Sequence, residues 1–428
     1  MSTKVAPPFG PIIERFRRAR KGLAVLLGVL AIAGCAQKDA GALTFSTWGS
    51  IEEIDTLKQV IAAFEKQNPD VPVRLIHIPD EYPHKVRLMA AAHHMPDVLF
   101  MENQTLAGFA SRGVLRDLGP FLAHDGSLKA KDFYPPVMQA LSYDGKLYAV
   151  PRDLSNLVVY YNRQLFDAAH VPYPHAGWTY AEMVADAQKL THGDQYGIGF
   201  SPYPLYWMPY LWSEGGDVMD PAMTHCTLLS PASMRGLTDY WNLRWRYHVA
   251  PTEAETGNAR MSQLFAQSKI AMEVDGRWVV PGYRKRLDFP WDVAPFPSGS
   301  AGSIVDADAS GWAISSACKH PDKAWRFVRF LASKPSISTF TASGLIVPSR
   351  PDVANSPVFL GGGAPSHGQV FLDVIGNSRP TLAPIPYDEI DYELIDSLGP
   401  AWDNEESLKD ALGPIAKRID ALLQESRE

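Results

Sequence analysis

The side chains with the clearest capacity for chemistry in this sequence are aromatic rings that gather in one stretch. PYPLYWMPYLW, residues 202–212, places five tyrosine and tryptophan rings within ten positions, and Trp278, Trp291 and Trp312 follow beside glycine or charged residues. A flat ring buries a large area at low entropic cost and offers its face to the C–H face of a sugar ring. Each ring taken alone is explained by core packing, but the set favours a binding cleft. Four polar side chains could bond ligand hydroxyls in such a cleft: Arg152, Asp275, Arg277 and Asp308.

Catalytic motifs are absent from the sequence. It contains no Gly-x-Ser-x-Gly elbow, no Gly-x4-Gly-Lys-Ser/Thr phosphate loop and no His-Glu-x-x-His zinc helix. His93 and His94 are adjacent, so on a helix they point about 100° apart and cannot share a metal as an i, i+4 pair can. Acidic pairs such as Asp306 and Asp308 occur, but catalytic pairing of carboxylates depends on their separation in space. The sequence therefore predicts no catalytic residue, no metal site and no cofactor.

The amino-terminal residues have the pattern of an export signal. The basic run ERFRRARKG leads into an uncharged segment, residues 23–34, which is shorter than the ~20 apolar residues that a spanning helix needs. We therefore expect residues 1–34 to be a signal peptide. The four residues that end at Cys35, Ile-Ala-Gly-Cys, resemble a bacterial lipobox and predict that Cys35 carries a membrane-anchoring lipid. The alternative is a plain cleaved signal with an incidental cysteine.

Charge, cysteine content and length limit the class of protein. Residues 1–34 carry a net charge of +5, so the whole-chain charge of −7 leaves −12 on residues 35–428, which disfavours nucleic acid as a partner. If Cys35 carries lipid, Cys226 and Cys318 remain, and their spacing does not decide whether they pair. A chain of 428 residues is long enough for two or three domains.

The elements expected after residue 40 alternate between strand and helix. ALTFSTW reads as a strand, Ser50 and Glu53 form a capping-box pattern at a helix start, and VPVRLIHI supplies a second strand. PDVLFM suits a buried parallel strand, and Glu102 and Asn103 follow at its carboxyl end, where open α/β sheets place ligands. A last helix is expected over residues 405–424, broken or kinked at Gly413-Pro414. The pattern indicates an α/β fold.

One segment carries a family resemblance. YDGKLYAVPRDLSNLVVYYNRQLFDAAHVPYP, residues 143–174, resembles the signature of the family 1 extracellular solute-binding proteins of bacterial ABC importers, the group of the maltose and glycerol-phosphate binders. Arg163 stands where that family more often has lysine. Further segments that resemble the family follow its order: STWGS, AAFEKQNPDVPV, MPDVLFM, GWTYAEMVADAQKLT, SKIAMEVDGRWVV, DVAPFPSG, GWAISSACKHPDKAWRFVRFLAS and GLIVPSR.

The resemblance implies a two-lobed periplasmic-binding-protein-like fold of type II, with a hinge and a ligand cleft between the lobes. It implies that the chain crosses between lobes near residues 152–156, 308–311 and 347–350. The expected N-lobe is then 35–155 with 311–349, and the expected C-lobe is 156–310 with 350–428. It also implies an exported monomer, periplasmic or on the cell surface, that hands a small molecule to the permease subunits of an ABC importer.

The resemblance also implies a set of ligand-binding residues. From the first lobe, the crossings and the second lobe these are Trp48, Glu102, Asn103, Arg152, Asp153, Trp207, Trp212, Gly276, Arg277, Trp278, Gly311, Trp312 and Arg350. Rings and acidic acceptors favour a sugar or short oligosaccharide. The alternative ligand is glycerol 3-phosphate or a glycerophosphodiester, because Arg152, Arg277 and Arg350 could pair with a phosphate. A surface carbohydrate-active enzyme and a purely adhesive lipoprotein are the other readings.

Overall fold

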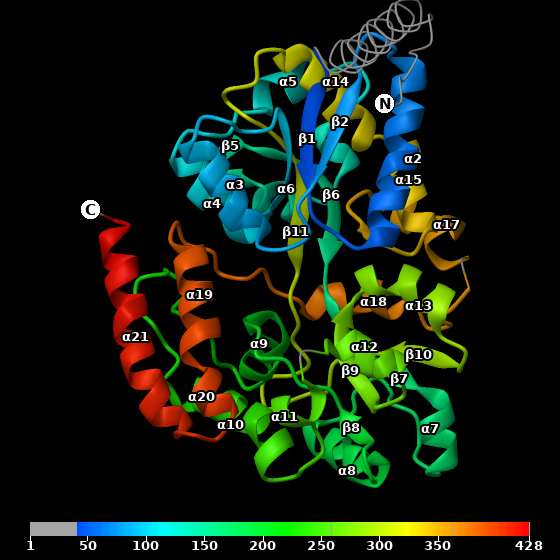
Figure 1. Ribbon diagram of the computed structural model, residues 1–428, viewed down its shortest axis with the longest axis vertical. Helices are drawn as coiled ribbons and strands as arrows, with labels where there is room; N and C mark the ends of the chain where they lie inside the picture. Colours follow the sequence, from blue (N-terminus) through cyan, green and yellow to red (C-terminus); the bar gives the residue numbers. More distant parts are fainter. Residues whose placement is uncertain (1–40, 258, 362, 428) are drawn as a thin grey trace, which may run out of the picture.

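The computed structural model describes residues 41–427 except 258 and 362, and Figure 1 shows them as two lobes. The predicted signal peptide and Cys35 lie outside the described residues. Within them, no helix combines the length and the apolar character that a membrane span requires. Cys226 and Cys318 are both free thiols.

The first lobe, here the N-lobe, is built on a six-stranded sheet in the order β12-β6-β11-β3-β1-β2. β1 runs parallel to β2 and β3, whereas β11 runs antiparallel to both β3 and β6. The strands are β1 (Leu43–Thr47), β2 (Val73–His77), β3 (Val98–Glu102), β6 (Ala149–Ser155), β11 (Asp308–Ile314) and β12 (Val347–Pro348). The helices are α2 (Ile51–Gln67), α3 (Tyr82–Ala91), α4 (Asn103–Ser111), α5 (Gly119–His124), α6 (Pro135–Ala140), α14 (Pro321–Leu331), α15 (Lys334–Ala342), α16 (Pro351–Ala354) and α17 (Pro357–Leu360), with the 3-10 turn η1 (Ala130–Asp132).

The second lobe, here the C-lobe, is built on a four-stranded sheet in the order β10-β7-β9-β8. Its strands are β7 (Leu157–Asn162), β8 (Tyr196–Ile198), β9 (Ile270–Gly276) and β10 (Trp291–Ala294). Its helices are α7 (Arg163–Ala168), α8 (Tyr180–Leu190), α9 (Pro204–Ser213), α10 (Pro231–Trp245), α11 (Glu253–Thr256), α12 (Met261–Ala266), α13 (Val280–Arg286), α18 (Val370–Asp373), α19 (Tyr387–Ser397), α20 (Gly399–Trp402) and α21 (Leu408–Glu425), with η2 (Arg277–Val279) and η3 (Val374–Asn377).

Local sequence signals fix several of these elements. The Ser50 side chain accepts a hydrogen bond from the Glu53 N–H, and so caps α2 as predicted. Asp144 and Gly145 both have positive φ, 48° and 70°, and turn the chain between β4 (Ser142–Tyr143) and β5 (Lys146–Leu147). Of the two alternatives predicted at Gly413-Pro414, a break or a kink, the break is wrong, because α21 continues through Pro414. Its buried apolar stripe, from Leu408 to Leu423, holds the helix against the C-lobe.

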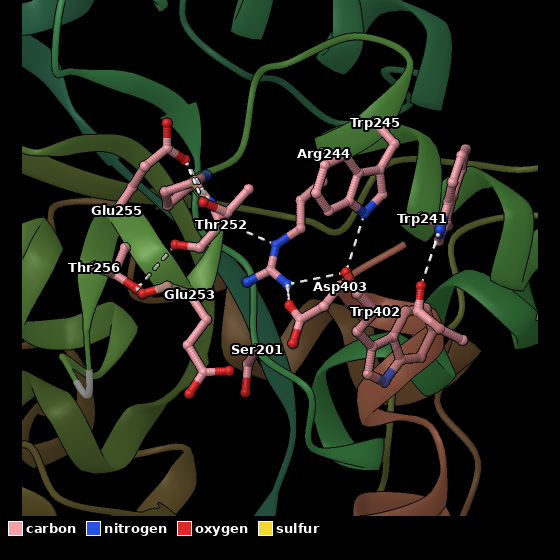
Figure 2. A network of polar contacts seen from close by, with 12 residues as sticks. Ser201, Trp241, Arg244, Trp245, Thr252, Glu253, Glu255, Thr256, Trp402 and Asp403 are labelled. Carbon is pink, nitrogen blue, oxygen red and sulfur yellow. Dashed lines mark hydrogen bonds and ion pairs between the residues drawn. The ribbon is translucent and has the colours of Figure 1, made fainter. Parts of the chain in front are cut away.

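Side chains of α10 attach the carboxy-terminal helices to the C-lobe (Figure 2). The indole N–H groups of Trp241 and Trp245 donate to the carbonyl oxygens of Ala401 and Trp402 at 3.1 Å and 3.0 Å. The buried Arg244 donates to the Trp402 carbonyl at 3.3 Å and lies 3.7 Å from the centroid of the Phe200 ring. These contacts fix α20 on the C-lobe. Because α20 follows α19 directly, they also fix the carboxyl end of α19 there.

Three segments connect the lobes, and two boundaries differ from the predicted ones. β6 passes into β7 through Asn156 alone, close to the predicted crossing. β11 already begins at Asp308, so residues 308–310 belong to the N-lobe sheet. Helices α16 and α17 pack on α15, so the chain stays with the N-lobe beyond residue 350 and crosses only after Leu360. The short helices α16 and α17 keep residues 351–360 on the N-lobe, so the chain crosses later than predicted. The segment GLIVPSR ends before these helices and does not predict them.

Candidate functional site

The carboxyl ends of β1 and β3 meet at the edge of the N-lobe sheet that faces the C-lobe. Trp48 follows β1 directly and is 38% exposed, which is unusual for so large a ring. Its ring centroid lies 6.3 Å from that of Phe100 in β3. Glu102 is the last residue of β3 and is half-buried. The structure therefore brings together Trp48 and Glu102, two of the predicted ligand-binding residues, at one sheet edge.

Glu102 lines a small cavity together with Tyr82, Phe100 and Phe109, among others. Burial, and then the charges of Asp308 and Asp153, raise the pKa of Glu102 to about 8. Glu102 is therefore mostly protonated at neutral pH. In that state it can donate one hydrogen bond and accept others, as a sugar hydroxyl also does.

Arg152 and Asp153 form a network behind this edge. Arg152 Nη1 lies 2.6 Å from Glu53 Oε1, and its Nε lies 3.0 Å from Asp153 Oδ2. The guanidinium also stacks 4.9 Å from the centroid of Phe100, and Asp153 accepts a short hydrogen bond from Ser310. Burial opposes the cation, but Asp153 and Glu53 outweigh burial and raise the pKa of Arg152. Both predicted residues are thus engaged within the protein.

Asn103 is buried and joins α4 to the start of β11, just after the second crossing. Its Nδ2 donates to Asp308 Oδ1 at 2.9 Å, and its Oδ1 accepts from the Ala309 N–H at 2.8 Å. The same Asp308 carboxylate accepts from Gln104 and from both donors of Thr381. The amide of Asn103 is therefore used in positioning α4 on β11.

The end of β9 supplies the C-lobe side of the junction. Trp278 is half-buried. Its ring packs against a cluster of buried apolar side chains in the C-lobe and against another in the N-lobe. Gly276 leaves room for this ring, since a Cβ at Gly276 would lie 2.0 Å from it. Burial raises the pKa of Asp275 to about 7, although hydrogen bonds from the Gly276 N–H and the Trp278 side chain oppose the rise. These residues hold Trp278 between the lobes.

Arg277 and Arg350, both predicted to bind ligand, have partners inside the protein. Arg277 donates to the Phe359 carbonyl oxygen at 3.1 Å and lies 4.1 Å from the centroid of the Phe359 ring. Burial lowers the pKa of Arg277 to about 10. Arg350 pairs with Asp352 at 3.1 Å and stacks over Phe133. Arg277 therefore fixes the chain just before the third crossing, and Arg350 fixes the start of α16 within the N-lobe.

Four further predicted residues lie in packed sheet or core positions. Trp207 and Trp212 are buried in the C-lobe core, and their indole N–H groups donate to Pro202 O and Asp217 Oδ1, both at 3.1 Å. Trp312 is buried in the N-lobe core with its ring centroid 6.1 Å from that of Phe340. A Cβ at Gly311 would lie 2.4 Å from Val150 O, so Gly311 serves the close pairing of β11 with β6. The three indoles and Gly311 therefore serve packing within their lobes.

Two tyrosines at the junction were missing from the predicted site. Tyr206, in the first turn of α9, is half-buried, and its pKa is raised by burial and then by Asp275 and Glu273. Tyr387 opens α19, and its pKa is raised by burial and by several carboxylates that include Asp308 and Glu102. Tyr206 belongs to the aromatic run seen in the sequence. Nothing in the sequence around Tyr387 marks it.

The arrangement is suited to holding a small molecule, and no group of three or more metal-ligating side chains occurs among the described residues. Partly exposed rings from both lobes, Trp48, Tyr206, Trp278 and Tyr387, are available for a ligand together with the carboxyl of Glu102. Such a set can cover the apolar faces of a ligand and bond its hydroxyls.

Known proteins share this architecture. An ABC substrate-binding protein of Listeria monocytogenes, solved with cycloalternan, is similar with a TM-score of 0.84 and 23% identity, covering 90% of this chain and 99% of that one. The GacH receptor of Streptomyces glaucescens, solved unliganded and with acarbose, has a TM-score of 0.81 and 25% identity, covering 90% and 98%. The maltotriose-binding protein of Pyrococcus abyssi is 22% identical over 73% of this chain and 68% of its own length. Residues 48–336 match the family described as bacterial extracellular solute-binding proteins, and the chain therefore belongs to that family.

Proposed function

We propose that this protein binds a sugar or short oligosaccharide between its lobes and delivers it to the permease of an ABC importer. Several relatives are named for such ligands: besides the maltotriose binder, the maltodextrin-binding and galactooligosaccharide-binding proteins of Bacillus subtilis are 23% and 22% identical to this chain. A ligand would shift the lobes from an open to a closed arrangement. The size of the shift is set by how much more tightly the ligand binds the closed arrangement than the open one.

The observation that carries this proposal is the engagement of the three arginines that could have bound a phosphate. Arg152 pairs with Glu53 and Asp153, Arg277 with the Phe359 carbonyl, and Arg350 with Asp352. The groups left at the junction are rings and the carboxyl of Glu102, next to Asp308. A phosphate dianion placed there would find no cation among these groups and would lie near the carboxylate of Asp308, whereas neutral hydroxyls would find hydrogen-bonding partners and apolar faces.

The second candidate ligand is glycerol 3-phosphate or a glycerophosphodiester. UgpB of Mycobacterium tuberculosis, solved with glycerophosphocholine, has a TM-score of 0.79 and 19% identity to this chain, which is a likeness of fold. A surface carbohydrate-active enzyme is a weaker candidate because the matched family consists of binding proteins. Turnover of nitrophenyl glycosides by the purified protein would overturn the binding assignment.

The binding residues that we propose are Trp48 and Glu102 from the N-lobe and Trp278, Tyr206 and Tyr387 from the C-lobe. We further propose that the protein is exported as a monomer and is held at the membrane by a lipid on Cys35. Lipid-precursor labelling in cells tests the anchor: we expect it in the wild type and its loss in Cys35→Ala. Equal labelling of both proteins would contradict the anchor without affecting the ligand.

Isothermal titration of residues 36–428 tests the function. The panel is maltose, maltotriose, a galactooligosaccharide, glycerol 3-phosphate and glycerophosphocholine. We expect heat with a sugar at a micromolar dissociation constant, which corresponds to about 8 kcal/mol of binding free energy. Heat with the phosphate compounds alone would overturn the sugar assignment and leave the importer assignment standing.

A further inference from the structure

The two lobes touch at a place that is separate from the crossing segments. Helices α3 and α4 of the N-lobe face α19 of the C-lobe, and Figure 1 shows this contact on the left, away from the strands β6 and β11. Arg87 of α3 forms a close ion pair with Asp388 of α19, 301 positions along the chain. Arg87 and Arg112 each also reach Glu389 at 4.0 Å.

This contact is partly desolvated, which distinguishes it from an ordinary surface ion pair. The side chains of Arg87 and Asp388 are only 22% and 12% exposed, whereas those of Arg112 and Glu389 are 52% and 43% exposed. Asp80 and Arg260 also approach across the lobes, at 3.7 Å, but their side chains are 66% and 79% exposed. Exposed pairs of that kind add almost nothing to stability. Burial strengthens the attraction between Arg87 and Asp388, but it also disfavours the charge of Asp388 and raises the pKa of this carboxyl to about 6.

Shape complementarity supports the charges. The ring of His84 meets that of Tyr392 edge-on, with centroids 6.4 Å apart. A Cβ at Gly108 in α4 would lie 3.0 Å from the Ile385 carbonyl oxygen, so the backbones of α4 and the segment before α19 come unusually close. Arg112 Nη1 donates to the Gly108 carbonyl at 2.6 Å, which holds Arg112 on α4 beside Glu389. The two surfaces are fitted to each other.

A rotation about the crossing segments would separate these surfaces, because α3 and α4 belong to one lobe and α19 packs on α9, α20 and α21 of the other. The contact can therefore form only when the lobes approach. We infer that the ion pair of Arg87 with Asp388, flanked by the more exposed Arg112 and Glu389, forms a clasp that stabilises the closed arrangement of the lobes. The clasp raises the fraction of molecules that can hold a ligand, and so raises affinity without touching the ligand.

The inference about the lobes is independent of the ligand, and the inference about affinity rests on the proposed function. The test therefore has two measurements on the same variants. They are Arg87→Ala, Asp388→Asn and the charge-swapped double variant Arg87→Asp/Asp388→Arg. Arg326→Ala is the matched control, since it removes an ion pair with Asp70 that lies within the N-lobe.

Small-angle X-ray scattering of the ligand-free proteins measures the lobe arrangement. We expect a larger radius of gyration in both single variants than in the wild type, a return toward the wild-type value in the double variant, and no change in the control. Equal radii in all five proteins would overturn the clasp.

Titration with maltotriose measures the effect on affinity. We expect the single variants to bind about tenfold more weakly than the wild type, and the double variant to recover most of that loss. Single variants with wild-type affinity would overturn the role of the clasp in binding. If the radii shift as expected while the wild type binds no sugar of the panel, the clasp stands and the proposed function fails.

Discussion

The surroundings of the Glu102 carboxyl group disfavour its charged form, and this makes the free energy of unfolding depend on pH. Its pKa is about 8 in the folded protein against an ordinary value of 4.5, because of burial and of the neighbouring Asp308 and Asp153. Between these pH values the folded protein holds a proton that the unfolded chain has released. The free energy of unfolding therefore falls as pH rises from about 4.5 to about 8.

Glu102→Gln should remove this contribution, because glutamine has no proton to lose. We expect the variant to gain about 1–3 kcal/mol of stability relative to the wild type on going from pH 5 to pH 8. Urea denaturation at both pH values measures it. Asp275 and Asp391 have raised pKa values as well, so the decisive quantity is the difference between the two proteins. Parallel pH dependence in both would contradict the assignment.

Two tryptophans separate binding from packing. Trp48→Ala should weaken sugar binding at least tenfold while stability changes little, because the ring is 38% exposed and stacks on the ligand in the proposed site. Trp312→Ala should lower the free energy of unfolding by about 3–5 kcal/mol, because it empties a packed core site. Titration and urea denaturation of each variant give both quantities. Wild-type affinity in Trp48→Ala would remove that residue from the site.

At the level of elements, the sequence was informative where local chemistry decides. The cap at Ser50, the turn at Asp144-Gly145 and the strand that ends at Glu102 are all in the structure, since each depends on a few neighbouring residues. The aromatic run 202–212 shows the limit of such reasoning. In α9 the rings point in several directions, so Tyr206 reaches the junction while Trp207 and Trp212 enter the core. Composition reveals the rings, but only tertiary packing decides which of them face a ligand.

The crossings show the same limit for charged residues. The sequence predicts ligand contacts for polar and charged residues near the crossings. In the structure, Asn103, Arg152 and Arg277 instead form hydrogen bonds with β11, α2 and α17, respectively. A residue that anchors a hinge and one that binds a ligand look alike in a sequence, because both are polar and both lie near the crossings. The structure separates the two roles, because the distances from each polar group to its neighbours show which groups already have a partner within the protein.

The close approach of Gly276 to Trp278 makes the end of β9 a test of positioning. Gly276→Ala would place a Cβ 2.0 Å from the indole, so the ring must move. We expect altered tryptophan fluorescence and weaker sugar binding, by about tenfold, although position 276 itself carries no ligand group. Gly376→Ala is the matched control, because a Cβ there has no neighbour within 4 Å. Equal affinities of the two variants would show that Trp278 does not contribute to the site.

On the scale of the whole molecule, the lobes are not separate bodies joined by a flexible linker. One cluster of buried apolar side chains runs from the N-lobe through the junction into the C-lobe, and Leu154, Ala309, Val158 and Phe371 belong to it. Asp306 adds polar bonds at the same place, since its carboxylate accepts from the Leu157 N–H and the Ser155 hydroxyl. Unfolding of either lobe would expose part of this cluster, which couples the stability of one lobe to that of the other.

This shared cluster predicts a single cooperative thermal transition, with equal calorimetric and van't Hoff enthalpies. A ligand that contacts both lobes should then move the whole transition upward, because binding to the folded state at 100 times the dissociation constant adds about 2.7 kcal/mol. Scanning calorimetry with and without the best sugar of the panel measures both effects. Two resolved transitions, of which the sugar moves one, would mean that the lobes unfold independently and that the ligand is held by one lobe. A single transition that moves as a unit is the result expected if closure around a sugar engages both lobes at once.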